Sequence, residues 1–281
     1  MKLVVVVQAV LLAAIALPAH ADDIFSDGFE ASGTCLWSFG PCGRMLDVPA
    51  GPFTMGDTAA TADQPVHTVT LSAYQIDQTL VTVDQYAACM QDGGCVAPDS
   101  TYAGFHLCNS GAPWSPGNHP INCVDWDLAA SYCAWAGKRY PTEAEWEKAA
   151  RGTDARSYPW GEDTATCSFA VMSDPNAGGN ACGLNHTAAV GSIPAGASPY
   201  GALDMAGDVW EWVADWYDPA YYAVSPSQDP TGPASSPSGL RGLRGGAWAN
   251  SNPLLLRAPY RYGGDPSVGS AYVGFRCARG G

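Results

Sequence analysis

Hydrophobic and polar positions follow a helical period in three short stretches of the chain. The first begins at Thr82, which forms a capping box with Gln85, and ends at the glycine pair 93–94. The second begins at Asp125 and ends at Gly137, with small and aromatic residues on its inner face. Each pattern predicts a short helix with one inward face.

The third helix is expected to begin with a second capping box, Thr142 and Glu145, and to end at Gly152. Its first half also carries Glu143 and Glu147. Paired carboxylates can act as the acid and the base in catalysis. Capping and the helix dipole account for negative charge at this end without any chemistry, and we favour that interpretation.

Short strands and many turns make up the rest of the pattern. Residues 68–71 alternate as a half-buried strand does. The 32 glycines and 22 prolines are spread over the chain, so long stretches must be turn or loop. Residues 225–239 are so rich in Pro, Ser and Gly that we expect a surface insertion there. The length fits one large domain.

The first 21 residues have the pattern of a secretory signal peptide. Lys2 precedes the apolar run 3–17, and residues 19–21 form a small-x-small cleavage site after Pro18. A membrane anchor is the alternative, but the run is too short to span a bilayer comfortably. We therefore expect export to the periplasm or the medium, a mature chain beginning at Asp22, and no membrane span after cleavage.

A polar leader, residues 22–44, separates this signal from the main domain, residues 45–281. The formal net charge of −14 disfavours nucleic acid as a partner, because phosphate recognition needs clustered Lys and Arg. A solvated acidic surface is sufficient to explain the charge.

Ten cysteines in an exported chain point to disulfides. Short separations suggest local bridges, and these leave Cys133 and Cys277 for a long-range one, although sequence alone does not fix the connectivity. Zinc is disfavoured because no cysteine or histidine pair has ligand spacing. The scattered histidines are interpreted as structural or surface residues: His67, His106, His119 and His186. The local pairs would be Cys35–Cys42, Cys89–Cys95, Cys108–Cys123 and Cys167–Cys182.

Seven segments, in order and spacing, resemble the sulfatase-modifying factor domain of formylglycine-generating enzymes. The resemblance covers residues 45–279 and implies a single α+β domain related to C-type lectins. It also implies the Cys133–Cys277 bridge, which joins a core helix to the C-terminal strand. The segments are 45–56, 65–67, 122–126, 136–147, 207–212, 244–248 and 274–277.

The same resemblance draws attention to two missing thiols. In formylglycine-generating enzymes, the loop after the Arg-Gly-Gly motif carries two cysteines that bind copper(I) and oxidise a sulfatase cysteine. Asn250 and Leu255 occupy those positions here, and Ala247 replaces a serine. Neither side chain binds copper(I) or exchanges disulfides. We therefore predict no copper site and no formylglycine synthesis by this mechanism.

A structural calcium site is implied for the segment 204–211. Its ligands would be the carboxylates of Asp204 and Glu211 and the carbonyls of Gly207 and Val209. Calcium prefers such hard oxygen donors. The alternative is that Glu211 caps a turn and Asp204 is solvated.

The resemblance also implies a ligand groove near the reactive loop. Aromatic and Arg side chains often dominate recognition surfaces, although large aromatic side chains are just as typical of hydrophobic cores. The resulting hypothesis is an exported binding or structural module for a peptide, protein or glycan. The alternative is an oxidoreductase of the wider family, including its non-haem-iron members, acting on another exported protein or a small molecule. The groove candidates are Trp210, Trp248, Asn250, Arg257, Tyr260 and Arg261.

Overall fold

The computed structural model describes residues 43–60, 63–98, 107–110 and 116–281. The signal peptide, most of the leader, His106 and the expected Cys35–Cys42 pair lie outside these residues. Within them, no helix combines the length and apolar character that crossing a membrane requires.

The three expected helices are present with the expected caps. They are α1 (Val83–Gln91), α2 (Trp126–Trp135) and α3 (Glu143–Arg151). The capping boxes of α1 and α3 are complete, since Thr82 and Thr142 each accept from the N3 backbone N–H and each N3 side chain accepts from the cap N–H. Asp125 caps α2 by accepting from the Leu128 N–H at 2.8 Å.

Nine short strands form three small sheets in the described chain. In order they are β1 (Met45–Val48), β2 (Gly51–Met55), β3 (His67–Leu71), β4 (Tyr74–Asp77), β5 (Trp210–Trp216), β6 (Arg241–Arg244), β7 (Tyr262–Gly264), β8 (Val273–Phe275) and β9 (Ala278–Gly280). The sheets have the orders β1-β4-β9, β2-β3 and β7-β6-β5-β8, and only the β5–β8 pair is parallel.

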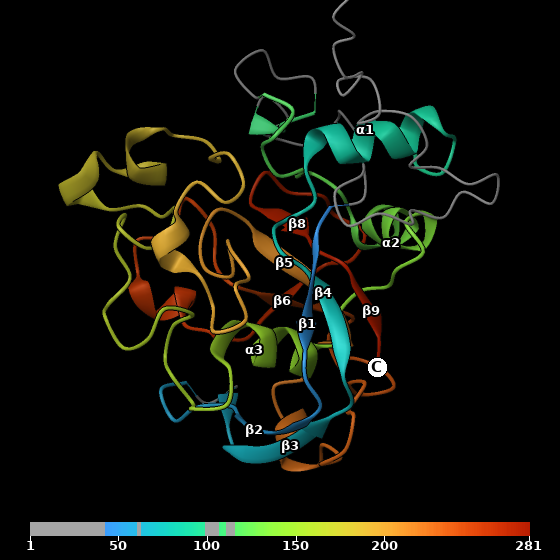
Figure 1. Ribbon diagram of the computed structural model, residues 1–281, viewed down its shortest axis with the longest axis vertical. Helices are drawn as coiled ribbons and strands as arrows, with labels where there is room; N and C mark the ends of the chain where they lie inside the picture. The colour runs from blue at the N-terminus through green and yellow to red at the C-terminus, as the bar shows by residue number, and fades with distance from the viewer. Residues whose placement is uncertain (1–42, 61–62, 99–106, 111–115) are drawn as a thin grey trace, which may run out of the picture.

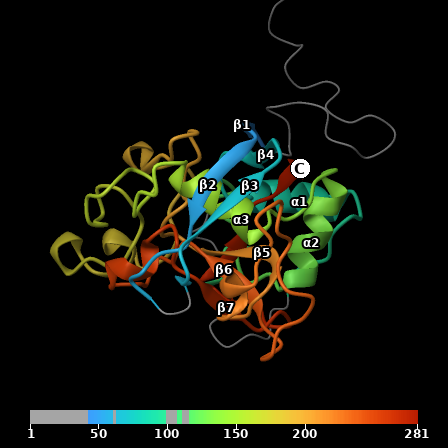
Figure 2. The same ribbon diagram turned by 90° about the horizontal axis from the view of Figure 1, so that it is seen from below.

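Loops fill much of the space between these elements, as Figures 1 and 2 show. The helix α3 lies near the middle of the molecule, close to the β2–β3 ribbon, and α1 and α2 lie together at one side. One apolar cluster joins α1 and α2 to β5 and β8, and a second surrounds α3. The architecture is a single α+β domain with few helices, as the sequence led us to expect.

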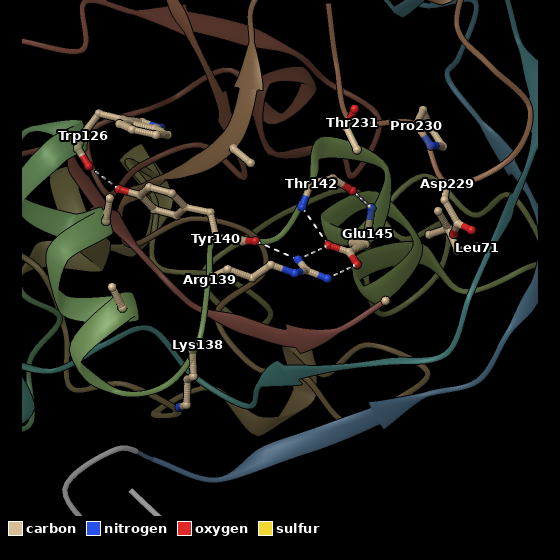
Figure 3. Close-up of a pocket in the computed structure, with 14 residues that line it drawn as sticks. Leu71, Trp126, Lys138, Arg139, Tyr140, Thr142, Glu145, Asp229, Pro230 and Thr231 are labelled. Atoms are coloured by element: carbon tan, nitrogen blue, oxygen red, sulfur yellow. Dashed lines mark hydrogen bonds and ion pairs between the residues drawn. The ribbon is translucent and has the colours of Figure 1, made fainter. Parts of the chain in front are cut away.

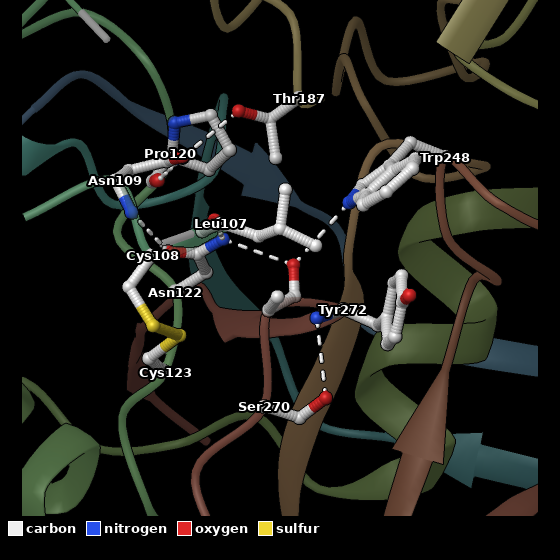
Figure 4. Close-up of a disulfide and its surroundings, with 11 residues drawn as sticks. Leu107, Cys108, Asn109, Pro120, Asn122, Cys123, Thr187, Trp248, Ser270 and Tyr272 are labelled. Atoms are coloured by element: carbon white, nitrogen blue, oxygen red, sulfur yellow. Dashed lines mark hydrogen bonds between the residues drawn. A yellow bond between two sulfur atoms is a disulfide. The ribbon is translucent and has the colours of Figure 1, made fainter. Parts of the chain in front are cut away.

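Four disulfides confirm four of the pairs expected from the sequence, and the described cysteines are all bridged. Cys133–Cys277 joins α2 to the chain after β8 over 144 residues, and the other three close short loops. Figure 4 shows Cys108–Cys123 beside Asn109 and Asn122. Bridges of this number indicate folding in an oxidising compartment.

Buried ion pairs anchor α3, all of whose residues are buried. Glu147 accepts from Arg244 at 2.5 Å and from Arg151 at 2.9 Å. Glu143 receives Arg261 in a two-point contact at 2.9 and 2.8 Å. Of the three glutamates, only Glu145 takes the expected capping role. The other two bind arginines about a hundred residues away, which the sequence did not indicate.

Candidate functional site

The loop that follows β6 bends sharply at a glycine pair. Gly246 has a φ of 80°, and a Cβ built on it would lie 3.1 Å from the Leu255 carbonyl oxygen, so a larger residue would strain the turn. Asn250 closes the next turn, because its Oδ1 accepts from the Ala247 N–H at 2.7 Å. The 3-10 helix Pro253–Leu256 follows, capped by Asn252. Both expected thiol positions therefore lie in this ordered loop.

A small cleft of about 120 Å³ lies beside this loop. Arg257 forms one wall, where its guanidinium contacts the Asp57 carboxylate and donates to Ser157 Oγ at 3.1 Å. Leu254 is half exposed, whereas Leu255 packs against the core. The lining residues are Ala59, Ala60, Asp63, Asn252, Leu254, Leu255, Arg257 and Tyr260.

Asp63 also lines the cleft, although it was not among the predicted groove residues. Its carboxylate is buried and accepts from the Arg261 N–H at 3.2 Å. Burial raises the pKa of Asp63 to about 6, although nearby Arg244 opposes the shift. Asp63 lies almost two hundred residues before Arg261, and no local sequence signal identified it.

An aromatic cluster continues from the cleft to the surface. The ring of Trp210 lies 6.1 Å from that of Tyr260 and 5.4 Å from that of Tyr262. Trp210 is buried, but Tyr262 is 51% exposed. The cluster therefore presents an accessible aromatic edge beside the cleft.

Three of the predicted groove residues are buried: Trp210, Trp248 and Arg261. Trp248 is buried, and its Nε1–H donates to the Ala271 carbonyl at 3.3 Å (Figure 4). Arg261 is buried against Glu143, with its guanidinium 3.9 Å from the centre of the Tyr222 ring. Of the six predicted groove residues, Arg257 and Tyr260 line the cleft, whereas the lining does not include Trp210, Trp248, Asn250 or Arg261.

The segment expected to bind calcium is buried and acidic. Both carboxylate oxygens of Asp204 accept from the Gly191 N–H, at 3.0 and 2.8 Å. Burial raises the pKa of Asp204 to about 6. Glu211 is fully buried, and Arg276 contacts both of its oxygens, at 2.6 and 2.9 Å. The charge of Glu211 is thus balanced within the protein.

The carboxylate of Asp208, in the same segment, has an unpaired buried oxygen, which favours a bound cation. Its Oδ1 accepts from the Ala188 N–H at 3.0 Å, whereas its Oδ2 is buried with no hydrogen-bond partner among the described residues. An unpaired buried carboxylate oxygen is costly unless a cation or a proton meets it. Together with the Asp204 carboxylate and nearby carbonyls, this donor set suits calcium.

The described histidines and cysteines do not form a metal site. The described part of the chain contains no group of three or more His, Cys, Asp or Glu residues arranged to hold a metal ion. His119 is buried, with Nδ1 3.0 Å from Thr187 Oγ1, and His67 packs edge-on against Tyr222.

A larger cavity of about 720 Å³ lies apart from the loop after β6, between α2, the start of α3 and residues 229–231 (Figure 3). Trp126 and Tyr140 form one side, and Leu71 and Pro230 lie on the opposite side. At its floor, the charges of Arg139 and Glu145 neutralise each other through two contacts of 2.7 Å. The cavity is therefore mainly apolar.

Comparisons with a family model and with known proteins point to the same family. Residues 38–280 match the model of the sulfatase-modifying factor enzyme 1-like domain. A formylglycine-generating enzyme of Streptomyces coelicolor is 36% identical over 83% of this chain and 88% of that protein. The hercynine oxygenase of Mycolicibacterium smegmatis is 33% identical over 85% of this chain and 62% of that protein.

Solved structures of the same architecture include PvdO from Pseudomonas aeruginosa. It aligns with a TM-score of 0.69 at 28% identity, covering 85% of this chain and 95% of that one. The Treponema denticola variable protein 1 aligns with a TM-score of 0.65 at 26% identity, covering 84% and 94%.

Proposed function

The chain belongs to the sulfatase-modifying factor enzyme family, and from this premise we propose that it is an exported binding module without formylglycine-generating activity. The observation that carries the proposal is the pair of side chains, Asn250 and Leu255, at the positions expected to hold the reactive thiols. The ligand would be a peptide, protein or glycan.

The chemistry of these two side chains supports a loss of copper–thiolate oxidation. Copper(I) binding and disulfide exchange both need a thiolate. The amide oxygen of Asn250 already closes a turn, and Leu255 offers only hydrocarbon. The described cysteines are committed to disulfides, so none of them replaces the missing pair.

Recognition is assigned to the cleft and its aromatic margin. A volume of about 120 Å³ is smaller than a typical small-molecule pocket, and it suits one side-chain-sized group of a larger ligand. Arg257 and Tyr260 are of the residue types that dominate binding energy at interfaces. The exposed ring of Tyr262 extends this surface.

Calcium is included in the proposal as a structural cation. The segment 204–211 would hold it through carboxylate and carbonyl oxygens, chosen from Asp204, Gly207, Val209 and Glu211. In a domain with short strands and long loops, a bound cation would stabilise the folded state by mass action.

The decisive experiment measures copper and turnover. We expect purified protein to bind no copper(I) with thiolate stoichiometry and to leave the cysteine of a Cys-x-Pro-x-Arg peptide unchanged by mass spectrometry. A double variant, Asn250→Cys with Leu255→Cys, is the matched control and should gain copper(I) binding. Conversion of the peptide by the wild-type protein would overturn the proposal.

Metal analysis separates the binding module from the alternative oxidoreductase. Calcium as the one stoichiometric metal of the native protein supports the binding module. Iron or copper at stoichiometric level would instead support an oxidoreductase related to the hercynine oxygenase that the chain resembles.

The role of the cleft is tested on glycan and peptide arrays. Ligands retained by the wild-type protein should be lost by Tyr260→Ala and by Arg257→Ala. Val96→Ala alters an exposed side chain outside the cleft lining and should bind as the wild type does. Equal binding by all three variants would remove the cleft from the proposal.

A further inference from the structure

We infer that the cavity between α2, the start of α3 and residues 229–231 binds an uncharged, planar aromatic small molecule. Its volume of about 720 Å³ lies within the range of small-molecule sites in proteins, whereas the cleft beside the loop after β6 has only about 120 Å³. The two linings have no residue in common. The inference therefore goes beyond the function proposed for the cleft and does not depend on it.

Small side chains on one stripe of α2 leave this space open. Ala130 and Ala134 are four residues apart, so they lie on the same face of the helix, in line with Trp126. Ala214 of β5 also lines the cavity. Larger residues of α2, such as Tyr132, are buried in the core instead. The hollow is therefore a feature of the outward stripe of α2, and the core beneath it is filled.

The aromatic side of the cavity is held in place without a ligand. Trp126 Nε1–H donates to the Val213 carbonyl at 2.9 Å, and the Trp126 carbonyl accepts from the Tyr140 hydroxyl at 2.8 Å (Figure 3). The guanidinium of Arg241 lies 3.9 Å from the centre of the Trp126 ring and 3.6 Å from that of the Trp216 ring. A side chain that is already ordered costs little entropy when a ligand packs against it.

The charged side chains of the lining already have partners, which favours an uncharged ligand. Arg139 and Glu145 meet in two contacts of 2.7 Å, and Lys138 Nζ lies 2.5 Å from an Asp77 carboxylate oxygen. Asp229, the remaining charged side chain, is exposed and accepts three hydrogen bonds from its neighbours. A charged ligand would lose its hydration among apolar walls without gaining a counterion of its own.

The two facing sides of the cavity favour a planar aromatic ligand. Trp126 and Tyr140, with ring centres 5.1 Å apart, form one side, and Leu71 and Pro230 lie on the other (Figure 3). Aromatic rings attract one another in edge-to-face and offset arrangements beyond the effect of buried area. A flexible aliphatic chain would gain no such contact and would lose more conformational freedom on binding.

The first test compares two dyes on the wild-type protein. N-phenylnaphthylamine is an uncharged aromatic compound whose fluorescence rises in apolar surroundings, and we expect it to bind at one saturable site. Anilinonaphthalene sulfonate has the same ring frame with an added sulfonate, and its affinity should be weaker by about tenfold or more. Equal affinities for the two dyes would overturn the assignment of an uncharged ligand.

The second test fills the cavity. Ala130→Leu and Ala134→Phe place larger side chains in the open space, and each should weaken the binding of N-phenylnaphthylamine about tenfold or more. Neither alanine is fully buried, so both variants should fold, which their Tm values check. Ser131→Leu enlarges an exposed residue of α2 outside the lining and should bind the dye as the wild type does. Wild-type affinity in both filled variants would overturn the inference.

Hydrogen exchange locates the dye without any substitution. Saturating N-phenylnaphthylamine should slow amide exchange in residues 126–145, which include α2 and the first turn of α3, and leave residues 247–257 unchanged. Slower exchange confined to residues 247–257 would place the dye at the loop after β6 and contradict the inference.

Competition decides between an aromatic and an aliphatic ligand. Naphthol, an uncharged aromatic compound, should displace N-phenylnaphthylamine at lower concentration than decanol, an uncharged aliphatic one. The reverse order would overturn the aromatic assignment. None of these outcomes bears on copper binding or on the ligand of the cleft, so the failure of this inference is distinguishable from that of the proposed function.

Discussion

Buried charged residues tie α3 to the loop that forms the cleft. Arg244 donates to Glu147 at 2.5 Å, and Arg261 to Glu143 at 2.8 Å, with all four side chains almost completely removed from water. A buried pair is costly to form but far more costly to break on one side, because the remaining charge loses its partner. These contacts therefore hold α3 to β6 and to the residue that follows Tyr260 of the cleft lining.

The first prediction concerns Glu147. Glu147→Gln should lower the free energy of unfolding by about 3–5 kcal/mol, because Arg244 and Arg151 would lose their shared carboxylate. Urea denaturation measures the loss. The exposed pair Arg156–Asp154 is the control, and Asp154→Asn should cost less than about 1 kcal/mol. Equal losses in the two variants would contradict this account.

The second prediction concerns Asp215, which accepts from the Glu143 N–H at 2.8 Å. Burial, and then the charge of Glu143, raise the pKa of Asp215 to about 8. The folded protein therefore holds a proton that the unfolded chain loses near pH 4, and stability falls as pH rises from about 4 to about 8. Asp215→Asn keeps the acceptor without this titration.

The free energy of unfolding of Asp215→Asn minus that of the wild type should therefore be larger at pH 8 than at pH 5. Urea unfolding at the two pH values gives the difference, and Asp163→Asn, in which the acid is exposed, provides the reference. A stability difference between Asp215→Asn and wild type that does not change with pH would refute the assignment.

At the scale of elements, the helices depend on covalent and tertiary support. Helices of nine or ten residues are marginal in isolation, even with complete capping boxes. The Cys133–Cys277 bridge fixes α2 to the chain between β8 and β9, and its loop of 144 residues restricts the unfolded chain strongly. The bridge Cys89–Cys95 joins the last turn of α1 to a residue six positions further along the chain, and it restricts the unfolded chain less.

The third prediction compares these two bridges. Replacing Cys133 and Cys277 by serine should cost about 2–5 kcal/mol, and replacing Cys89 and Cys95 should cost less. Denaturant midpoints under non-reducing conditions test the order. A larger loss from the short bridge would show that native packing around Cys89, rather than loop length, dominates.

At the scale of the whole molecule, the domain combines small sheets with long loops, and disulfides supply part of its stability (Figure 1). Such a fold requires an oxidising environment to form correctly. The apolar N-terminal run and its cleavage pattern are consistent with that requirement.

The fourth prediction joins export and oxidation. Produced with residues 1–21, the protein should begin at Asp22 by N-terminal sequencing and show no free thiol when unfolded in a thiol assay. Produced in a reducing cytoplasm without those residues, it should contain free thiols and have a lower Tm. An uncleaved N-terminus on the exported protein would rule out the assigned cleavage site.

The sequence by itself determined the local features of this protein. Helix caps depend on residues three apart, so Thr82, Asp125 and Thr142 marked the helix starts correctly. Motif order identified the family and the Cys133–Cys277 bridge, and the short cysteine spacings indicated the other three described bridges.

Only the tertiary structure decided which side chains meet across long separations. Arg257 and Arg261 look equivalent in sequence, yet one lines the cleft and the other is buried against Glu143, 118 residues earlier. Asp63 and Asp208 gained their significance in the same way, from burial and from the partners that they have or lack. Desolvation and pairing depend on the packing of distant segments, and a local pattern carries no record of that packing.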